Sequence, residues 1–118
     1  ADAHNNMGIA LSHKGRLDEA INHYAKALSI NPDHADAHIN LGAAFFRKGE
    51  LNKAIEHFED ALHIMPGNAD AHNNLGVALL QQGRLDEAAR QFEEALRINP
   101  NHENAGYNHR YVSRLMAQ

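Results

Sequence analysis

Apolar and small residues recur along this chain with the spacing of amphipathic helices. The first run places them at i, i+3, i+4 and i+7, one face of a helix, at Ala3, Met7, Gly8, Ala10 and Leu11. A second run of the same kind extends from Leu17 to Leu28. Gly15 between them is typical of a helix C-terminus, and Asn31-Pro32 ends the second run because the residue before proline avoids helical angles. The pattern predicts a helix–turn–helix.

This helix–turn–helix pattern occurs three times without a gap, over residues 1–34, 35–68 and 69–102, and each copy opens with the string ADAH. Such a fixed period indicates stacked copies of one unit, here a single all-α domain over 1–118 that ends in a terminal helix at 103–118. The inner turns fall at Gly15, Gly49 and Gly83. We expect the helix caps at Asp18, Asn52 and Asp86 and at Asp33, Gly67 and Asn101.

Small residues carry the expected packing within each copy. The glycines Gly8, Gly42 and Gly76 and the alanines Ala20, Ala54 and Ala88 let paired helices approach closely. Tyr24, Phe58 and Phe92 are expected to fill space between repeats, near Ala27, Ala61 and Ala95. With Met7, Leu11, Ala27 and Pro32 and their counterparts, these positions resemble the 34-residue signature of the tetratricopeptide repeat family. The departure is at the family's tryptophan position, where this chain has His4, His38 and His72.

The resemblance implies a right-handed superhelical α–α solenoid with a terminal capping helix, whose first helices line a concave groove. In this family the groove binds an extended peptide or a partner helix. The phrase AHNNLG at 71–76 is also similar to the repeat arm of O-linked N-acetylglucosamine transferases.

Two sets of residues face the groove in the geometry that the resemblance implies. One is an asparagine ladder at a single register, Asn6, Asn40, Asn74 and Asn108, whose amides match the N–H and C=O groups of an extended peptide. The other is apolar: Ile39, Phe46, Val77 and Leu80. A purely structural role stays open for both sets, through amide bonds to a neighbouring backbone or through lateral helix contact. For Asp2, Asp36 and Asp70, capping at a helix start is favoured over attraction of cationic ligands.

Composition narrows the function classes. The formal net charge is −4 and the basic residues are scattered, which argues against nucleic acid as a partner. The apolar runs are too short for membrane insertion, and the absence of cysteine excludes disulfides while leaving the compartment open. The start at Ala1, in register with the repeat, suggests a fragment of a longer protein.

Ten histidines raise the question of metal or catalytic chemistry. His4, His38 and His72 stand one per repeat, about 10 Å apart on helix-packing distances, too far for one ion. We therefore expect these histidines to pack and predict no metal site and no cofactor. Ser12, Ser29 and Ser113 lie in no nucleophile motif, so we also predict that the chain is not an enzyme.

The leading hypothesis is a non-catalytic module that binds a protein or peptide in its groove. One alternative is self-assembly through the end helices, with Tyr107, Tyr111, Leu115 and Met116 docking on a second copy. Another is the substrate-recruiting arm of a larger glycosyltransferase or secretion component. Capture of chaperone C-terminal tails is disfavoured. Where that family variant has lysine, asparagine, asparagine, lysine and arginine, this chain has Asn5, Ile9, Asn40, Asp70 and Asn74, and only Asn40 fits.

Overall fold

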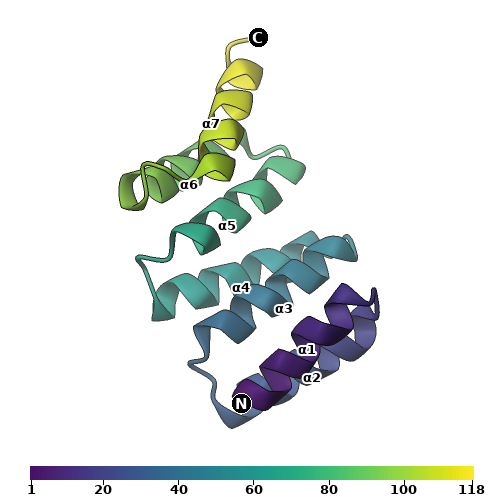
Figure 1. Cartoon of the computed structure of the whole chain (residues 1–118). Coiled ribbons are helices and arrows are strands. Elements are labelled where there is room, and N and C mark those ends of the chain that lie inside the picture. Colours follow the sequence, from purple (N-terminus) through teal and green to yellow (C-terminus); the bar gives the residue numbers. More distant parts are fainter. The chain divides into compact units, whose positions relative to one another are not determined.

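A computed structural model describes all 118 residues as seven helices without strands (Figure 1). The helices are α1 Asp2–His13, α2 Leu17–Ile30, α3 Ala35–Arg47, α4 Leu51–Ile64, α5 Ala69–Gln81, α6 Leu85–Ile98 and α7 Glu103–Met116. The predicted all-α class, the three helical pairs and the terminal helix are thus confirmed. Contacts divide the chain into two compact units, Ala1–Met65 with α1–α4 and Pro66–Gln118 with α5–α7, each described by itself below.

The two helices of each pair meet at a glycine. A Cβ atom built on Gly76 of α5 would lie 2.5 Å from Cε1 of Phe92 on α6, closer than any real contact. Gly8 meets Tyr24 in the same way, and Gly42 meets Phe58. The facing alanines Ala20, Ala54 and Ala88 are fully buried. The predicted close approach of the paired helices at small residues is confirmed. The aromatic rings, which were expected between repeats, also contact the glycine of their own repeat, while Tyr24 shares a core cluster with Leu41 and Ala44 of repeat 2.

The glycines of the inner turns adopt the predicted conformation, but the helix caps that follow them are not the predicted residues. Gly15, Gly49 and Gly83 have φ of 78°, 82° and 78°, the left-handed region that glycine favours. The Arg16 N–H then donates back to the Leu11 carbonyl, so α2 begins immediately after the turn. Asp18, Asn52 and Asp86 consequently lie one residue inside their helices, and the prediction that they cap them was wrong. The N-cap residues are Arg16, Glu50 and Arg84, none with a capping side-chain hydrogen bond.

The outer caps lie one residue later than predicted, whereas the inner caps lie two residues earlier. In the first outer loop the Asp33 N–H donates to Oδ1 of Asn31, and this Asx turn leaves His34 in extended conformation at the helix start. The N-caps are His34, Asn68 and His102, whose side chains accept from the backbone N–H three residues on. Asp33, Gly67 and Asn101 are therefore not the caps. A histidine Nδ1 serves in two of the three places.

Candidate functional site

The predicted groove residues lie on the first helices of the pairs or, for Asn108, on the terminal helix α7, and all stay outside the cores. In unit 1, Asn6 is exposed, while Ile39, Asn40 and Phe46 are half-buried. In unit 2, Asn74, Val77, Leu80 and Asn108 are half-buried. Each unit therefore presents asparagine amides beside apolar side chains on neighbouring first helices, since α1 packs against α3 and α5 packs against α7.

Two of the four ladder asparagines bond to a second asparagine. Nδ2 of Asn40 donates to Oδ1 of Asn5 at 3.0 Å, and Nδ2 of Asn108 donates to Oδ1 of Asn73 at the same distance. Both acceptors are buried, with 7% of the residue exposed. The bonds join side chains of neighbouring repeats, whereas the structural alternative drawn from the sequence expected bonds to backbone. A primary amide has two N–H donors and a carbonyl oxygen, so Asn40 and Asn108 keep polar capacity for a ligand.

Asn74 differs from Asn40 and Asn108 because it makes no side-chain hydrogen bond within unit 2. Asn6 at the start of the ladder likewise has no side-chain hydrogen bond.

At the other end of the α1–α3 contact, Arg47 donates through Nη1 to Oγ of Ser12 at 2.9 Å and to its carbonyl oxygen at 3.3 Å. Unit 1 thus carries a strip that begins at the Asn5–Asn40 bond and ends at the Ser12–Arg47 bond. The half-buried Phe46 precedes Arg47 on α3.

The aspartates at the start of the first helices are also engaged. Nε2 of His34 donates to Oδ1 of Asp2 at 2.8 Å, while Nδ1 of the same ring accepts from the Ala37 N–H at 3.1 Å. His102 repeats this arrangement in unit 2, with Asp70 at 2.7 Å and the Ala105 N–H. Two of the three aspartates therefore bind a histidine that caps a following helix, α3 or α7. This use reduces their availability for a cationic ligand.

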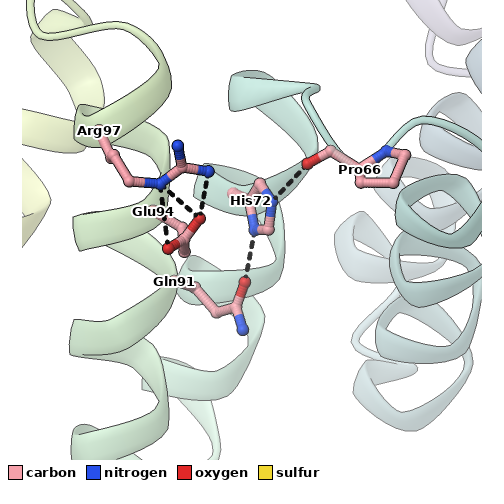
Figure 2. Close-up of polar contacts among 5 residues, drawn as sticks. All are labelled: Pro66, His72, Gln91, Glu94 and Arg97. Atoms are coloured by element: carbon pink, nitrogen blue, oxygen red, sulfur yellow. Dashed lines mark hydrogen bonds and ion pairs between the residues drawn. The ribbon is translucent and has the colours of Figure 1, made fainter.

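The histidines at the family's tryptophan position bond to the second helix of their own repeat. In repeat 3, Figure 2 shows His72 with Nε2 donating to the Pro66 carbonyl at 3.0 Å and Nδ1 lying 2.7 Å from the side-chain oxygen of Gln91. In repeat 2, Nε2 of His38 donates to the Pro32 carbonyl at 3.0 Å. The half-buried rings fit the predicted packing role, and they make polar contacts that periodicity alone does not reveal.

Repeat 2 holds a cluster of three potential metal ligands, His38, His57 and Asp60, whose ligand atoms all lie within 4.8 Å of one another. Burial, and then the neighbouring His38, lower the pKa of His57, so its imidazole is neutral at pH 7. The sequence analysis missed this cluster because it compared histidines at the same register of different repeats. The overlooked signal was His57 and Asp60 on one face of the second helix, opposite His38.

The terminal helix α7 presents a different surface. Val112 is fully buried, whereas Tyr107, Tyr111 and Met116 are 65%, 46% and 45% exposed. Tyr107 and Tyr111 line a small pocket of about 40 Å³ together with Arg110 and Arg114. Of the four residues expected to dock on a second copy, Tyr107, Tyr111 and Met116 are exposed and Leu115 is half-buried.

Family models described as tetratricopeptide repeat match residues 1–67 and residues 45–118. The chain belongs to the tetratricopeptide repeat family. A search of curated proteins gives no match. No helix combines the length and the hydrophobicity that crossing a membrane requires.

Solved structures of the same fold are numerous. One is the first TPR of Spaghetti (RPAP3) bound to the HSP90 peptide SRMEEVD, at 25% identity and a TM-score of 0.96, covering 98% of this chain and 92% of that chain. Another is the Sgt2 TPR domain from Aspergillus fumigatus, at 24% identity and a TM-score of 0.94, covering 98% and 78%. MamA is similar at 26% identity and a TM-score of 0.87, covering 93% and 64%.

Proposed function

We propose that this chain is a non-catalytic interaction module that binds an extended peptide or a partner helix along its first helices. The observation that carries the proposal is the fold shared with the RPAP3 domain, a structure that contains a peptide. The surface supports it, because each unit offers amides for a peptide backbone beside apolar side chains for anchor residues. We take residues 1–118 to act as one domain.

In this proposal the contact residues are Asn6, Ile39, Asn40, Phe46, Asn74, Val77, Leu80 and Asn108. Asn74 and Asn6 use their whole amide for the ligand, since no side-chain bond engages them. Asn40 and Asn108 contribute the amide atoms left free by their bonds to Asn5 and Asn73.

The ligand we propose is neutral or basic rather than an acidic tail. The peptide in the RPAP3 structure carries two glutamates and an aspartate in its printed sequence. In this chain the first helices carry exposed aspartates near their starts, Asp36 in unit 1 and Asp70 in unit 2, and the chain carries a net charge of −4. Like charges on both partners would oppose association. Nucleic acid is not a proposed partner for the same reason.

Selection from a phage-displayed random peptide library, followed by calorimetry with the selected peptides, tests the proposal. Asn74→Ala and Phe46→Ala are expected to weaken binding at least fivefold, since each removes a contact without breaking a side-chain hydrogen bond. Lys26→Ala, at an exposed site of α2, is the matched control and should bind like the original chain. Peptides that bind all three variants equally would refute this surface.

The exposed tyrosines of α7 favour self-assembly as a second candidate. An apolar, partly aromatic end face of a repeat array tends to continue the stack, and Tyr107 and Met116 are about half exposed or more. Light scattering over a range of protein concentrations tests whether the chain self-assembles. A dimer that Tyr107→Lys dissociates supports self-assembly, and a monomer at all concentrations removes it.

A further inference from the structure

We propose that His38, His57 and Asp60 bind one divalent transition-metal ion of the zinc type in repeat 2. The proposal goes beyond peptide binding and does not depend on it. It also departs from the sequence-based expectation of no metal site, which considered only histidines of different repeats. All three ligands lie within unit 1, on α3 and α4.

The distances suit a metal ion. Nδ1 of His38 lies 3.2 Å from Nδ1 of His57. Two nitrogen ligands at about 2.05 Å from a tetrahedral zinc ion stand about 3.3 Å apart, so the pair already has the needed separation. Oδ2 of Asp60 lies 4.0 Å from Nδ1 of His38 and must approach by roughly 0.7 Å to reach the ligand–ligand separation of a zinc site. The Asp60 side chain is 54% exposed, so rotamer change can supply this movement.

The hydrogen bonds of the two rings indicate which nitrogens of His38 and His57 carry protons. Nε2 of His38 carries a proton, because it donates to the Pro32 carbonyl, so its Nδ1 lone pair is free. In the metal-free protein the Nδ1–H of His57 donates to that lone pair. The two rings face one another with centroids 5.4 Å apart and planes at 28°. Metal binding requires each ring to turn until both lone pairs converge on the ion. The single proton of the neutral His57 ring then resides on Nε2, so Nδ1 can ligate the ion and no net proton is released.

The surroundings resemble those of metal-binding histidines. A ligating histidine characteristically donates its other ring N–H to a backbone carbonyl or carboxylate, as His38 does to Pro32. The His57 ring is held against Phe45, with centroids 5.7 Å apart. Alongside lies a pocket of about 370 Å³ lined by Glu56, His57, Glu59, Asp60 and His63. Its carboxylates attract a cation, and water fills the remaining coordination position.

The other two repeats lack the full set and show what each ligand adds. Repeat 1 has the same histidine pair, His4 and His23, with Nδ1 atoms 3.1 Å apart, but the register of Asp60 holds Lys26. A lysine at that register opposes a cation instead of ligating it.

Repeat 3 replaces His57 by Gln91 and Asp60 by Glu94. There Glu94 is engaged by Arg97, with Nη2 of Arg97 2.9 Å from Oε2 (Figure 2). Repeat 2 alone combines two imidazoles with a carboxylate that no arginine holds.

Zinc titration of the full chain, in competition with a chromophoric chelator, tests the proposal. One equivalent of Zn²⁺ should bind with a saturable isotherm. His57→Gln and Asp60→Lys copy the residues of repeats 3 and 1, so the fold should tolerate them, and each should lower the affinity at least tenfold. The matched control is His23→Gln in repeat 1, which should leave affinity and stoichiometry unchanged.

Imidazole ¹⁵N chemical shifts give a second readout that does not depend on variants. On addition of Zn²⁺ the Nδ1 signals of His38 and His57 should move, and those of His4 and His23 should not. Co²⁺ should give the intense visible absorption of a four-coordinate site. Absence of saturable binding, or equal affinity in His57→Gln and Asp60→Lys, would overturn the proposal. Loss of the equivalent in His23→Gln would place the ion in repeat 1 and overturn it too.

Discussion

Alanine substitution should lower thermal stability at ladder asparagines that make a side-chain hydrogen bond, such as Asn40, and leave it nearly unchanged at those that make none, such as Asn74. Asn40→Ala deletes the Nδ2 donor that lies 3.0 Å from Oδ1 of Asn5. Only 7% of Asn5 is exposed, so its Oδ1 is left without a hydrogen-bond partner where water has little access. Leaving a buried acceptor unpaired costs about 1–3 kcal/mol, and the higher helix propensity of alanine returns about 0.5 kcal/mol.

The expected net loss for Asn40→Ala is therefore about 1–2 kcal/mol. For 118 residues, an unfolding entropy of about 2.1 cal/mol/K per residue converts 1 kcal/mol into a Tm change of about 4 °C. Thermal unfolding followed by circular dichroism should thus show Asn40→Ala melting about 4–8 °C lower. Asn74→Ala loses no side-chain bond within its unit, so its Tm should change by less than about 2 °C.

A double-mutant cycle between Asn5 and Asn40 assigns the loss to their bond. Once Asn5→Ala has removed the acceptor, Asn40→Ala should cost about 1 kcal/mol less than it does in the original chain. Equal melting temperatures for Asn40→Ala and Asn74→Ala, together with a coupling free energy near zero, would refute the structural role of the bond. The same pair of variants informs the functional proposal, because a binding defect in Asn74→Ala would then be free of any stability effect.

Two further variants test the packing and the caps of unit 2. Gly76→Ala places a methyl group 2.5 Å from Phe92, and the overpacking, less the gain in helix propensity, should cost about 1–2 kcal/mol in urea denaturation. Gly67→Ala, where nothing lies within 4 Å, is its control, and an equal loss there would contradict the packing argument. His102→Ala removes the Nδ1 acceptor of the Ala105 N–H and should cost about 1 kcal/mol and speed amide exchange at the start of α7. His102→Asn should restore slow amide exchange there, because Asn68 caps α5 with its side-chain oxygen. Fast exchange in His102→Asn would argue against a capping role.

Periodicity predicted the fold because the same apolar spacing and the same glycines recur three times. The seven helices, the left-handed glycines and the close approach of paired helices at Gly8, Gly42 and Gly76 all follow from residue type and spacing. The caps were misplaced by one residue at the outer loops and by two at the inner turns, since the Asx turn at Asn31 and the tight turn after Gly15 shift where each helix begins. Those hydrogen bonds depend on local geometry that composition does not specify.

The candidate sites were predictable only in part. The sequence placed the ladder asparagines on the first helices, and all of them lie outside the core. It did not pair Asn40 with Asn5, because the bond joins adjacent registers of neighbouring repeats. It also missed His38 with His57, which stand at different registers of one repeat and meet only when its two helices pack.

The side-chain links between repeats have a consequence for how the chain unfolds. Each unit contains one asparagine pair and one aspartate–histidine link of its own, Asn5–Asn40 with Asp2–His34 and Asn73–Asn108 with Asp70–His102. In an array where stability is a sum of local terms, such links raise the cooperativity of the segment that they join. Amide exchange should therefore report two protection levels, one for α1–α4 and one for α5–α7, and a ligand that spans both would merge them into one transition.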